Sequence, residues 1–218
     1  MKIYAALPAE LLDGWNSRVQ THPALQRVDD HYHDTDEWLE VLRGEMTFYA
    51  ISGDDWRLHS GDVFHIPRGE VHHVEIGAAG VEYRMYAQMD IQSGFSRSLS
   101  ADELAMLRTN IEFPLREENT DGGAGEFFER TLSDALVFVR ADCSVIGKDT
   151  FTAAFTARGR ASAGTVCVLN RTENGVLLST TVTVGQGAAQ KAFLNVRLFA
   201  KEADAWKCRV WVNYPQPR

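Results

Sequence analysis

Glycine and proline interrupt the first ninety residues so often that a long helix has no room to form there. The run from 31 to 77, HYHDTDEWLEVLRGEMTFYAISGDDWRLHSGDVFHIPRGEVHHVEIG, alternates short apolar stretches with turn residues. Glycine adopts turn conformations freely and proline lacks a backbone N–H, so both tend to end regular elements. Short strands divided by such turns predict an antiparallel sandwich or a small barrel.

The chain changes composition near its middle. All seven histidines lie between His22 and His73, whereas the three cysteines come after residue 140. Residues 1–95 hold 7 Lys and Arg against 16 Asp and Glu, a net charge of −9, and residues 96–218 hold 15 against 14, a net of +1. We therefore predict two domains, 1–95 and 96–218, with the boundary near residues 92–100. Neither half is basic, so no nucleic-acid partner is expected.

The amino terminus and the cysteines indicate a cytoplasmic protein. The first residues, MKIYAALPAELLDGW, lack a basic region followed by a continuous apolar stretch, so we expect no signal peptide. No apolar run approaches the roughly 20 residues that span a bilayer, so no membrane contact is expected. Cys143, Cys167 and Cys208 are widely spaced, and we predict buried free thiols.

The second half begins with helical patterns and continues with strands. Ser100 and Glu103 form a capping box, and a helix is predicted to follow until Pro114 kinks or ends it. Two shorter helices are predicted over 125–134 and 148–157. Apolar strands come between and after them, with hairpin turns at 173–175 and 202–204. Helices followed by an antiparallel meander are typical of an α+β domain.

Five residues in the first half share a spacing that favours a binding site. If 29–33 is a strand, His31 and His33 point to the same face, because strand side chains alternate. Glu37 follows four residues later, and Gly44 is expected to turn the chain into the next strand. Downstream, a tight turn at 67–69 places His72 at the start of a returning strand.

These positions resemble the two motifs of the cupin family over about residues 25–90. The first motif, H-x-H-x(3,4)-E-x6-G, matches His31, His33, Glu37 and Gly44. The second, G-x5-P-x-G-x2-H, matches Gly61, Pro67, Gly69 and His72. The resemblance implies an all-β cupin barrel, also called a double-stranded β-helix or jelly roll. It also implies one divalent metal bound by His31, His33, Glu37 and His72.

Imidazole and carboxylate ligands suit Fe, Mn, Ni, Co or Zn, so this donor set does not choose the metal. Four protein ligands on an octahedral ion leave two positions open, which favours catalysis over a structural role. The other polar side chains nearby receive structural interpretations. We predict solvated turn residues at Asp34 and Asp36, a packed His65, an exposed or acid-paired His73, and no role for His22 and His59.

Residues 100–215 resemble the SnoaL-like branch of the nuclear-transport-factor-two-like fold. The resemblance rests on the helix and strand pattern, on a turn from Asp142 to Lys148 and on Trp206 near the start of the last strand. It implies a cone-shaped α+β domain with a curved antiparallel sheet. Strand alternation predicts a pocket lined by Arg140, Asn195, Arg197, Trp211 and Asn213 that takes an anionic or aromatic ligand. The alternative is that this face is solvated or packs on a partner subunit.

Three functions remain open from the sequence. The first is a metal-dependent cupin enzyme that acts on a small organic molecule, aromatic or polyketide-like, by oxygenase, isomerase or cyclase chemistry. The second is a non-catalytic binding or sensing protein whose second domain drives dimerisation. The third places the activity in the second-domain pocket, with the cupin half as scaffold. In each case we expect a homodimer.

Overall fold

The computed structural model describes residues 1–9, 14–88, 96–118, 123–156, 162–185 and 190–216, with the backbone alone over 162–168. The predicted domain boundary at 92–100 therefore lies partly outside the described residues. The chain divides into two compact units, residues 1–100 and 101–218. No helix in the described part of the chain is long and apolar enough to cross a membrane.

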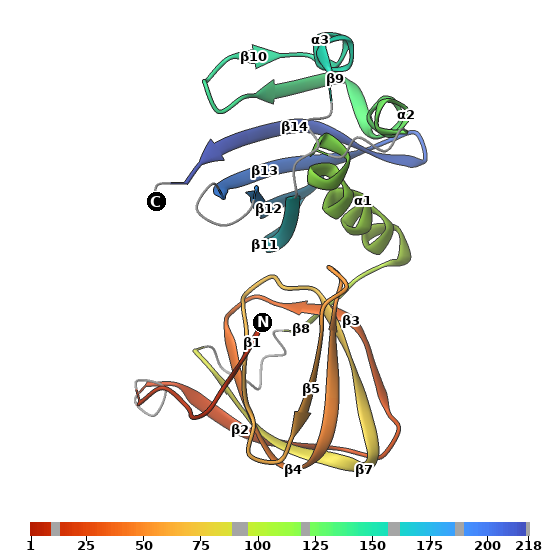
Figure 1. The fold of residues 1–218 in the computed structure, drawn as a ribbon. Helices are drawn as coiled ribbons and strands as arrows, with labels where there is room; N and C mark the ends of the chain where they lie inside the picture. The colour runs from red at the N-terminus through yellow and green to blue at the C-terminus, as the bar shows by residue number, and fades with distance from the viewer. Residues whose placement is uncertain (10–13, 89–95, 119–122, 157–161, 186–189, 217–218) are drawn as a thin grey trace. The chain divides into compact units, whose positions relative to one another are not determined.

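Unit 1 is a curled antiparallel sheet of short and long strands (Figure 1). The order is β1-β6-β4-β7-β3-β8, with β2 also paired to β7 and β5 to β4. This agrees with the predicted all-β architecture of the first half. The strands are β1 (Lys2–Tyr4), β2 (Asn16–His22), β3 (Arg27–His33), β4 (Glu37–Ala50), β5 (Asp55–His59), β6 (Val63–Ile66), β7 (His72–Ala87) and β8 (Ser96–Ser98).

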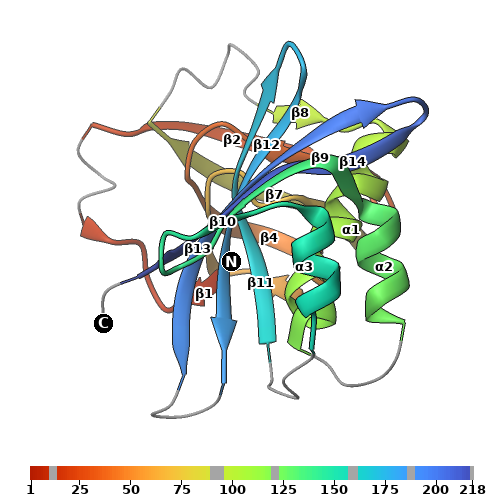
Figure 2. The same cartoon turned by 90° about the horizontal axis from the view of Figure 1, so that it is seen from above.

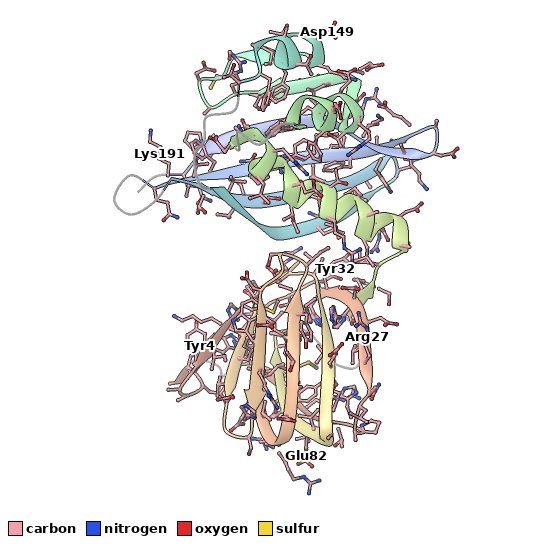
Figure 3. The ribbon with its side chains drawn as sticks, turned by 45° about the vertical axis from the view of Figure 1, so that its right-hand side comes forward. Tyr4, Arg27, Tyr32, Glu82, Asp149 and Lys191 are labelled. Atoms are coloured by element: carbon pink, nitrogen blue, oxygen red, sulfur yellow. The ribbon has the colours of Figure 1, made fainter. Side chains whose placement is uncertain are left out.

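The interior of unit 1 is filled by the inward side chains of β4, β6 and β7. In β4, Leu39, Val41, Met46 and Phe48 are all at most 3% exposed. Alternate residues of a strand face the same side, so each half of β4 contributes one apolar row. Figure 3 shows side chains inside this curled sheet, with Tyr32 and Glu82 at opposite ends of the unit.

Gly44 does not end a strand, contrary to the sequence-based expectation. It lies inside β4, and the β4–β7 ladder shifts register on both sides of it. Gly44 has φ 85°, and a Cβ built on it would lie 2.0 Å from the carbonyl oxygen of Gly80. The glycine therefore allows a bulge and a close backbone approach within one continuous strand.

Replacing Gly44 should destabilise unit 1 more than replacing a turn glycine of similar conformation. We expect Gly44→Ala to cost roughly 3 kcal/mol or more, because it adds a backbone clash to the positive φ. Gly53 has φ 97° but open space around it, so Gly53→Ala should cost about 1 kcal/mol. Thermal unfolding of the full chain measures both, and equal losses would contradict this account of Gly44.

Unit 2 is mostly sheet, with three helices gathered along one side of its strands (Figure 2). The strand order is β10-β9-β14-β13-β12-β11. The four strands from β11 to β14 form the predicted antiparallel meander. The elements are α1 (Ala101–Glu118), α2 (Ala124–Thr131), β9 (Leu132–Val139), β10 (Val145–Ile146), α3 (Lys148–Ala154), β11 (Ser162–Thr172), β12 (Gly175–Val184), β13 (Lys191–Glu202) and β14 (Ala205–Pro215).

Three details of unit 2 differ from the expectations. Strand β9 pairs in parallel with β14, so the sheet is mixed. Helix α1 continues through Pro114, because buried side chains before it, such as Leu107 and Phe113, and Glu118 after it hold the helix in place. Cys143 is exposed with φ 67°, since it occupies a turn rather than a strand.

Cys167 and Cys208 lie in strands β11 and β14 of unit 2. Cys208 is buried as expected, and burial raises the pKa of its thiol to about 12. It is therefore an unreactive packed thiol at neutral pH. The side chain of Cys167 lies outside the described residues.

Candidate metal centre and cavity

Three histidines from two strands meet inside unit 1. One ring nitrogen from each of His31, His33 and His72 lies within 4.8 Å of the others, and all three side chains are buried. The ring centroids are 4.4 Å apart for His31 and His72, 4.9 Å for His31 and His33, and 5.2 Å for His33 and His72. Neutral imidazoles at this spacing could hold a metal ion.

Strand pairing and one turn bring these histidines together. In the ladder between β3 and β7, His31 lies directly opposite His72. The turn at Pro67–Glu70 that precedes β7 is fastened to the end of β3. There the N–H of Gly69 donates to the carbonyl of His33 at 3.0 Å, and the N–H of Arg68 donates to the carboxylate of Asp36 at 2.8 Å. The spacing of the second motif thus sets the start of β7.

Two of the histidines are oriented by backbone carbonyls. Nδ1 of His31 lies 2.7 Å from the carbonyl oxygen of Asp29, and Nδ1 of His72 lies 2.9 Å from that of Glu70. Each ring therefore donates through Nδ1 and keeps Nε2 as the acceptor. Nε2 of His72 is buried and has no hydrogen-bond partner, which is the situation expected of a metal-binding nitrogen before metal is bound.

Burial keeps these rings neutral. Desolvation, reinforced by the neighbouring His33, lowers the pKa of His31 to about 4. Desolvation, reinforced by His31 and His33, also lowers the pKa of His72 well below its usual value. A neutral imidazole is the form that binds metal, so the fold prepares the donors at neutral pH.

Glu37 lies beside the cluster. Its Oε1 is 2.8 Å from Nδ1 of His33, and the residue is only 1% exposed. Glu37 is the first residue of β4 and lines the same cavity as the three histidines. All four residues of the predicted ligand set therefore line one cavity, and the three histidines are the group whose ligand atoms lie within 4.8 Å of one another.

The nearby polar residues have other partners. Asp34 accepts a hydrogen bond from Arg97 Nε at 2.7 Å. Asp36 holds the Arg68 amide, and the His65 ring stacks on Trp38 with a centroid distance of 4.6 Å. The His73 ring lies 3.4 Å from Asp30 and stacks on Tyr49. His65 and His73 therefore have structural surroundings, as expected.

Glu70 is a buried carboxyl group that the sequence did not single out. It is 3% exposed, and its Oε2 has no hydrogen-bond partner. Burial raises the pKa of this carboxyl to about 7. No motif predicts this residue, because its burial results from the turn that positions His72.

The cluster opens into a cavity of about 240 Å³. Its walls are mainly apolar, but strand β2 contributes three polar side chains, Arg18, Gln20 and His22. They alternate with outward residues such as Val19, which is 47% exposed. Gln20 and His22 are half-buried, and Arg18 lines the cavity from an exposed position. In most barrel strands the apolar side chains face inward and the polar ones outward, so β2 shows the opposite pattern. The sequence-based interpretation assigned no role to His22 because it did not recognise β2.

Tyr83 on β7 links the polar side chains of that wall. Its hydroxyl donates to Oε1 of Gln20 at 2.7 Å and lies 3.3 Å from Nε2 of His22. Burial and the nearby Glu37 raise the pKa of the phenol, so it stays protonated. The other ring nitrogen of His22 contacts Gln26 at 3.0 Å.

The side chains predicted for the second pocket separate into two groups. Arg140, Asn195 and Asn213 line a cavity of about 410 Å³ in unit 2. Arg197 and Trp211 are completely buried and are not among the residues that line this cavity. Arg197 and Trp211 are covered by side chains of α1, α2 and α3, among them Phe113, Phe128 and Phe151.

Buried Arg197 is held by polar and aromatic groups. Its guanidinium donates to Asn110 at 2.9 Å and to Asn195 at 2.8 Å, and it stacks against Phe113 and Trp211. Trp211 Nε1 also donates to Asn195 Oδ1, at 2.9 Å. Desolvation lowers the pKa of Arg197 to about 10, which still leaves it charged.

The metal-free protein should lose stability as the pH falls from 6.5 towards 4. The unfolded chain protonates His31 near pH 6.5, whereas the folded chain does so near pH 4. Between these values the unfolded state binds the extra proton, so the free energy of unfolding falls by up to ~3 kcal/mol. Urea unfolding in EDTA at pH 7 and pH 5 measures this.

His31→Gln should reduce this pH dependence, because glutamine does not titrate, while His72 keeps its own contribution of the same sign. His59→Gln is the matched control, since the His59 side chain is 58% exposed. Identical slopes for wild type and His31→Gln would contradict the assignment of this proton to His31.

Residues 18–84 match the family model of the cupin domain. The chain therefore carries a cupin domain over this part of unit 1. A search of curated proteins finds no match.

Solved structures similar to the chain include three from different bacteria. A cupin superfamily protein from Desulfitobacterium hafniense DCB-2 is 16% identical over 41% of this chain and 77% of its own, with a TM-score of 0.32. A DUF861 family protein from Thermotoga maritima is 22% identical over 38% and 94%, with a TM-score of 0.31. A DMSP lyase from Ruegeria pomeroyi DSS-3 is 20% identical over 41% and 54%, with a TM-score of 0.32.

Proposed function

We propose that the chain is a metal-dependent enzyme that binds one divalent transition metal in unit 1 and acts there on a small organic molecule. The observation that carries the proposal is the buried cluster of His31, His33 and His72, with Nε2 of His72 unpartnered. Glu37 supplies the fourth ligand. Iron, manganese, nickel, cobalt and zinc all fit this donor set.

The surroundings of the cluster favour catalysis. When bound, the metal would supply Lewis-acid or oxygen chemistry, of the oxygenase, isomerase or cyclase type. The backbone carbonyls of Asp29 and Glu70 fix the two histidine rings. The apolar wall, which includes Leu39, Phe48 and Ile66, excludes water from the cavity beside them.

Removing two of the metal ligands should abolish metal binding. We expect about one metal ion per wild-type chain and close to none for the His31→Ala/His33→Ala double variant, measured by elemental analysis after purification. His73→Ala is the control, because His73 neighbours a proposed ligand but stacks on Tyr49. Equal metal content in wild type and double variant would refute the metal centre.

A second candidate function is ligand binding without catalysis, and it has its own support in unit 2. Asn195 accepts from both Arg197 and Trp211 through Oδ1, so its amide N–H groups remain for the cavity. No described residue bonds to them. A SnoaL-like domain with such a cavity could bind a polar or aromatic molecule, and a homodimer formed through unit 2 would suit a sensor.

A substrate panel distinguishes the enzyme from the binding protein. Metal-loaded chain should turn over at least one member of a set of phenols, keto acids and sugars, or consume oxygen with it. His72→Ala should abolish that turnover, and Asn213→Ala should leave it intact. Loss of turnover in Asn213→Ala but not in His72→Ala would assign the activity to unit 2. Binding of a panel member without turnover would favour the sensor.

A further inference from the structure

Strand β2 has a polar face directed into the cavity of unit 1. Arg18, Gln20 and His22 face inward, although an inward position in a curled sheet usually holds an apolar residue. Burying polar groups costs free energy unless they acquire partners, and the half-buried Gln20 and His22 have partners in Tyr83 and Gln26. Arg18 lines the same cavity but is exposed, so its guanidinium lies between the cavity and solvent.

Arg18 has no partner in the part of the chain that the structure describes. It lines the cavity and makes neither a hydrogen bond nor an ion pair there. Glu37 is the other charged side chain in the described cavity wall apart from the histidines, and its carboxylate lies against His33 instead. The guanidinium therefore presents its N–H donors at the cavity without a protein acceptor.

The register of the sheet places Arg18 within reach of a molecule bound at the histidines. Arg18 pairs with Met85 on β7, and Glu37 pairs with the nearby Ala87. Arg18 on β2 and Glu37 on β4 therefore lie on opposite sides of β7, and their positions differ by two residues along that strand. With strands about 4.8 Å apart and about 3.4 Å per residue, their backbones are about 12 Å apart. Both side chains extend into the cavity, so the distance between their charged groups is shorter than the distance between their backbones. A small molecule can span it.

Charge and volume further restrict this molecule. A divalent ion with one carboxylate ligand leaves a net positive charge, and Arg18 adds another, so the cavity favours an anion. Arginine binds carboxylates through two parallel N–H···O bonds. A volume of about 240 Å³ corresponds to roughly eight waters, and thus to a molecule of on the order of ten non-hydrogen atoms.

We infer that the ligand of this cavity is a small organic carboxylate, with its carboxylate on Arg18 and its other end toward the histidine cluster. The orientation rests on the proposed metal centre, whereas the preference for a carboxylate rests on Arg18 itself. Tyr83, fixed by Gln20 and His22, lines the same cavity and offers its oxygen to a polar group of the ligand.

Matched acids and amides test this inference. The probes are lactate and lactamide, butyrate and butyramide, and benzoate and benzamide, titrated calorimetrically into the full chain loaded with Co²⁺. At least one acid should bind roughly tenfold or more tightly than its amide, the usual contribution of a charge-assisted pair. If no acid binds more tightly than its amide, the inference is overturned.

Variants assign the preference to Arg18. Arg18→Gln should remove the preference for the acid without changing the cobalt content. Arg18→Lys should keep part of the preference, because lysine keeps the positive charge but lacks the two parallel N–H donors of arginine. Arg43→Gln is the control, since the Arg43 side chain is 82% exposed and lies outside the cavity wall. Equal losses in Arg18→Gln and Arg43→Gln would overturn the role of Arg18.

Measured metal content separates this inference from the metal proposal. If wild-type chain binds no cobalt, the metal proposal fails, and the acid-over-amide preference can still be measured on the metal-free chain. If cobalt binds and the preference is absent, the carboxylate inference alone fails.

Discussion

The long pairing of β4 with β7 is the constraint on which unit 1 depends. Both strands pass through the centre of the curled sheet, and each begins at a site residue, Glu37 or His72. The ladder pairs Glu37 with Ala87 at one point and Ala50 with His72 at another. The ladder can pair both ends because the backbone of Gly44 approaches the carbonyl of Gly80 so closely that a Cβ atom at residue 44 would clash with it. The bulge at that point thus helps to set the positions of Glu37 and His72, which lie far from it in sequence.

Burial and hydrogen bonding act together at the histidines. Desolvation alone would leave neutral rings free to rotate, and hydrogen bonds alone would leave them titratable near neutral pH. The carbonyls of Asp29 and Glu70 fix the rings, and burial removes the proton. His31 and His72 are therefore already oriented and deprotonated, which would lower the cost of binding a metal.

The sequence predicted the grouping of His31, His33, Glu37 and His72 better than the rest of the cavity. His31, His33, Glu37 and His72 could be grouped because motif spacing and strand alternation are local signals. The wall formed by β2 could not, because the inward direction of Arg18 depends on its pairing with β7. Gly44 was expected at a turn because positive φ is commonest there, and sequence does not distinguish a turn from a bulge. Asn195, Arg197 and Trp211 lie close together as predicted, but the complete burial of Arg197 and Trp211 depends on tertiary packing.

The two units place a guanidinium in different surroundings, because Arg197 is buried and Arg18 is exposed at a cavity. Arg197 in unit 2 has amide and aromatic partners, and its charge is spread over groups that belong to the fold. Arg18 in unit 1 lines a cavity with no described partner, next to side chains that do have partners. An arginine enclosed by its own chain stabilises packing, whereas an arginine left open beside a cavity remains available to a ligand. This difference, rather than the presence of a positive charge, is why we place carboxylate recognition in unit 1.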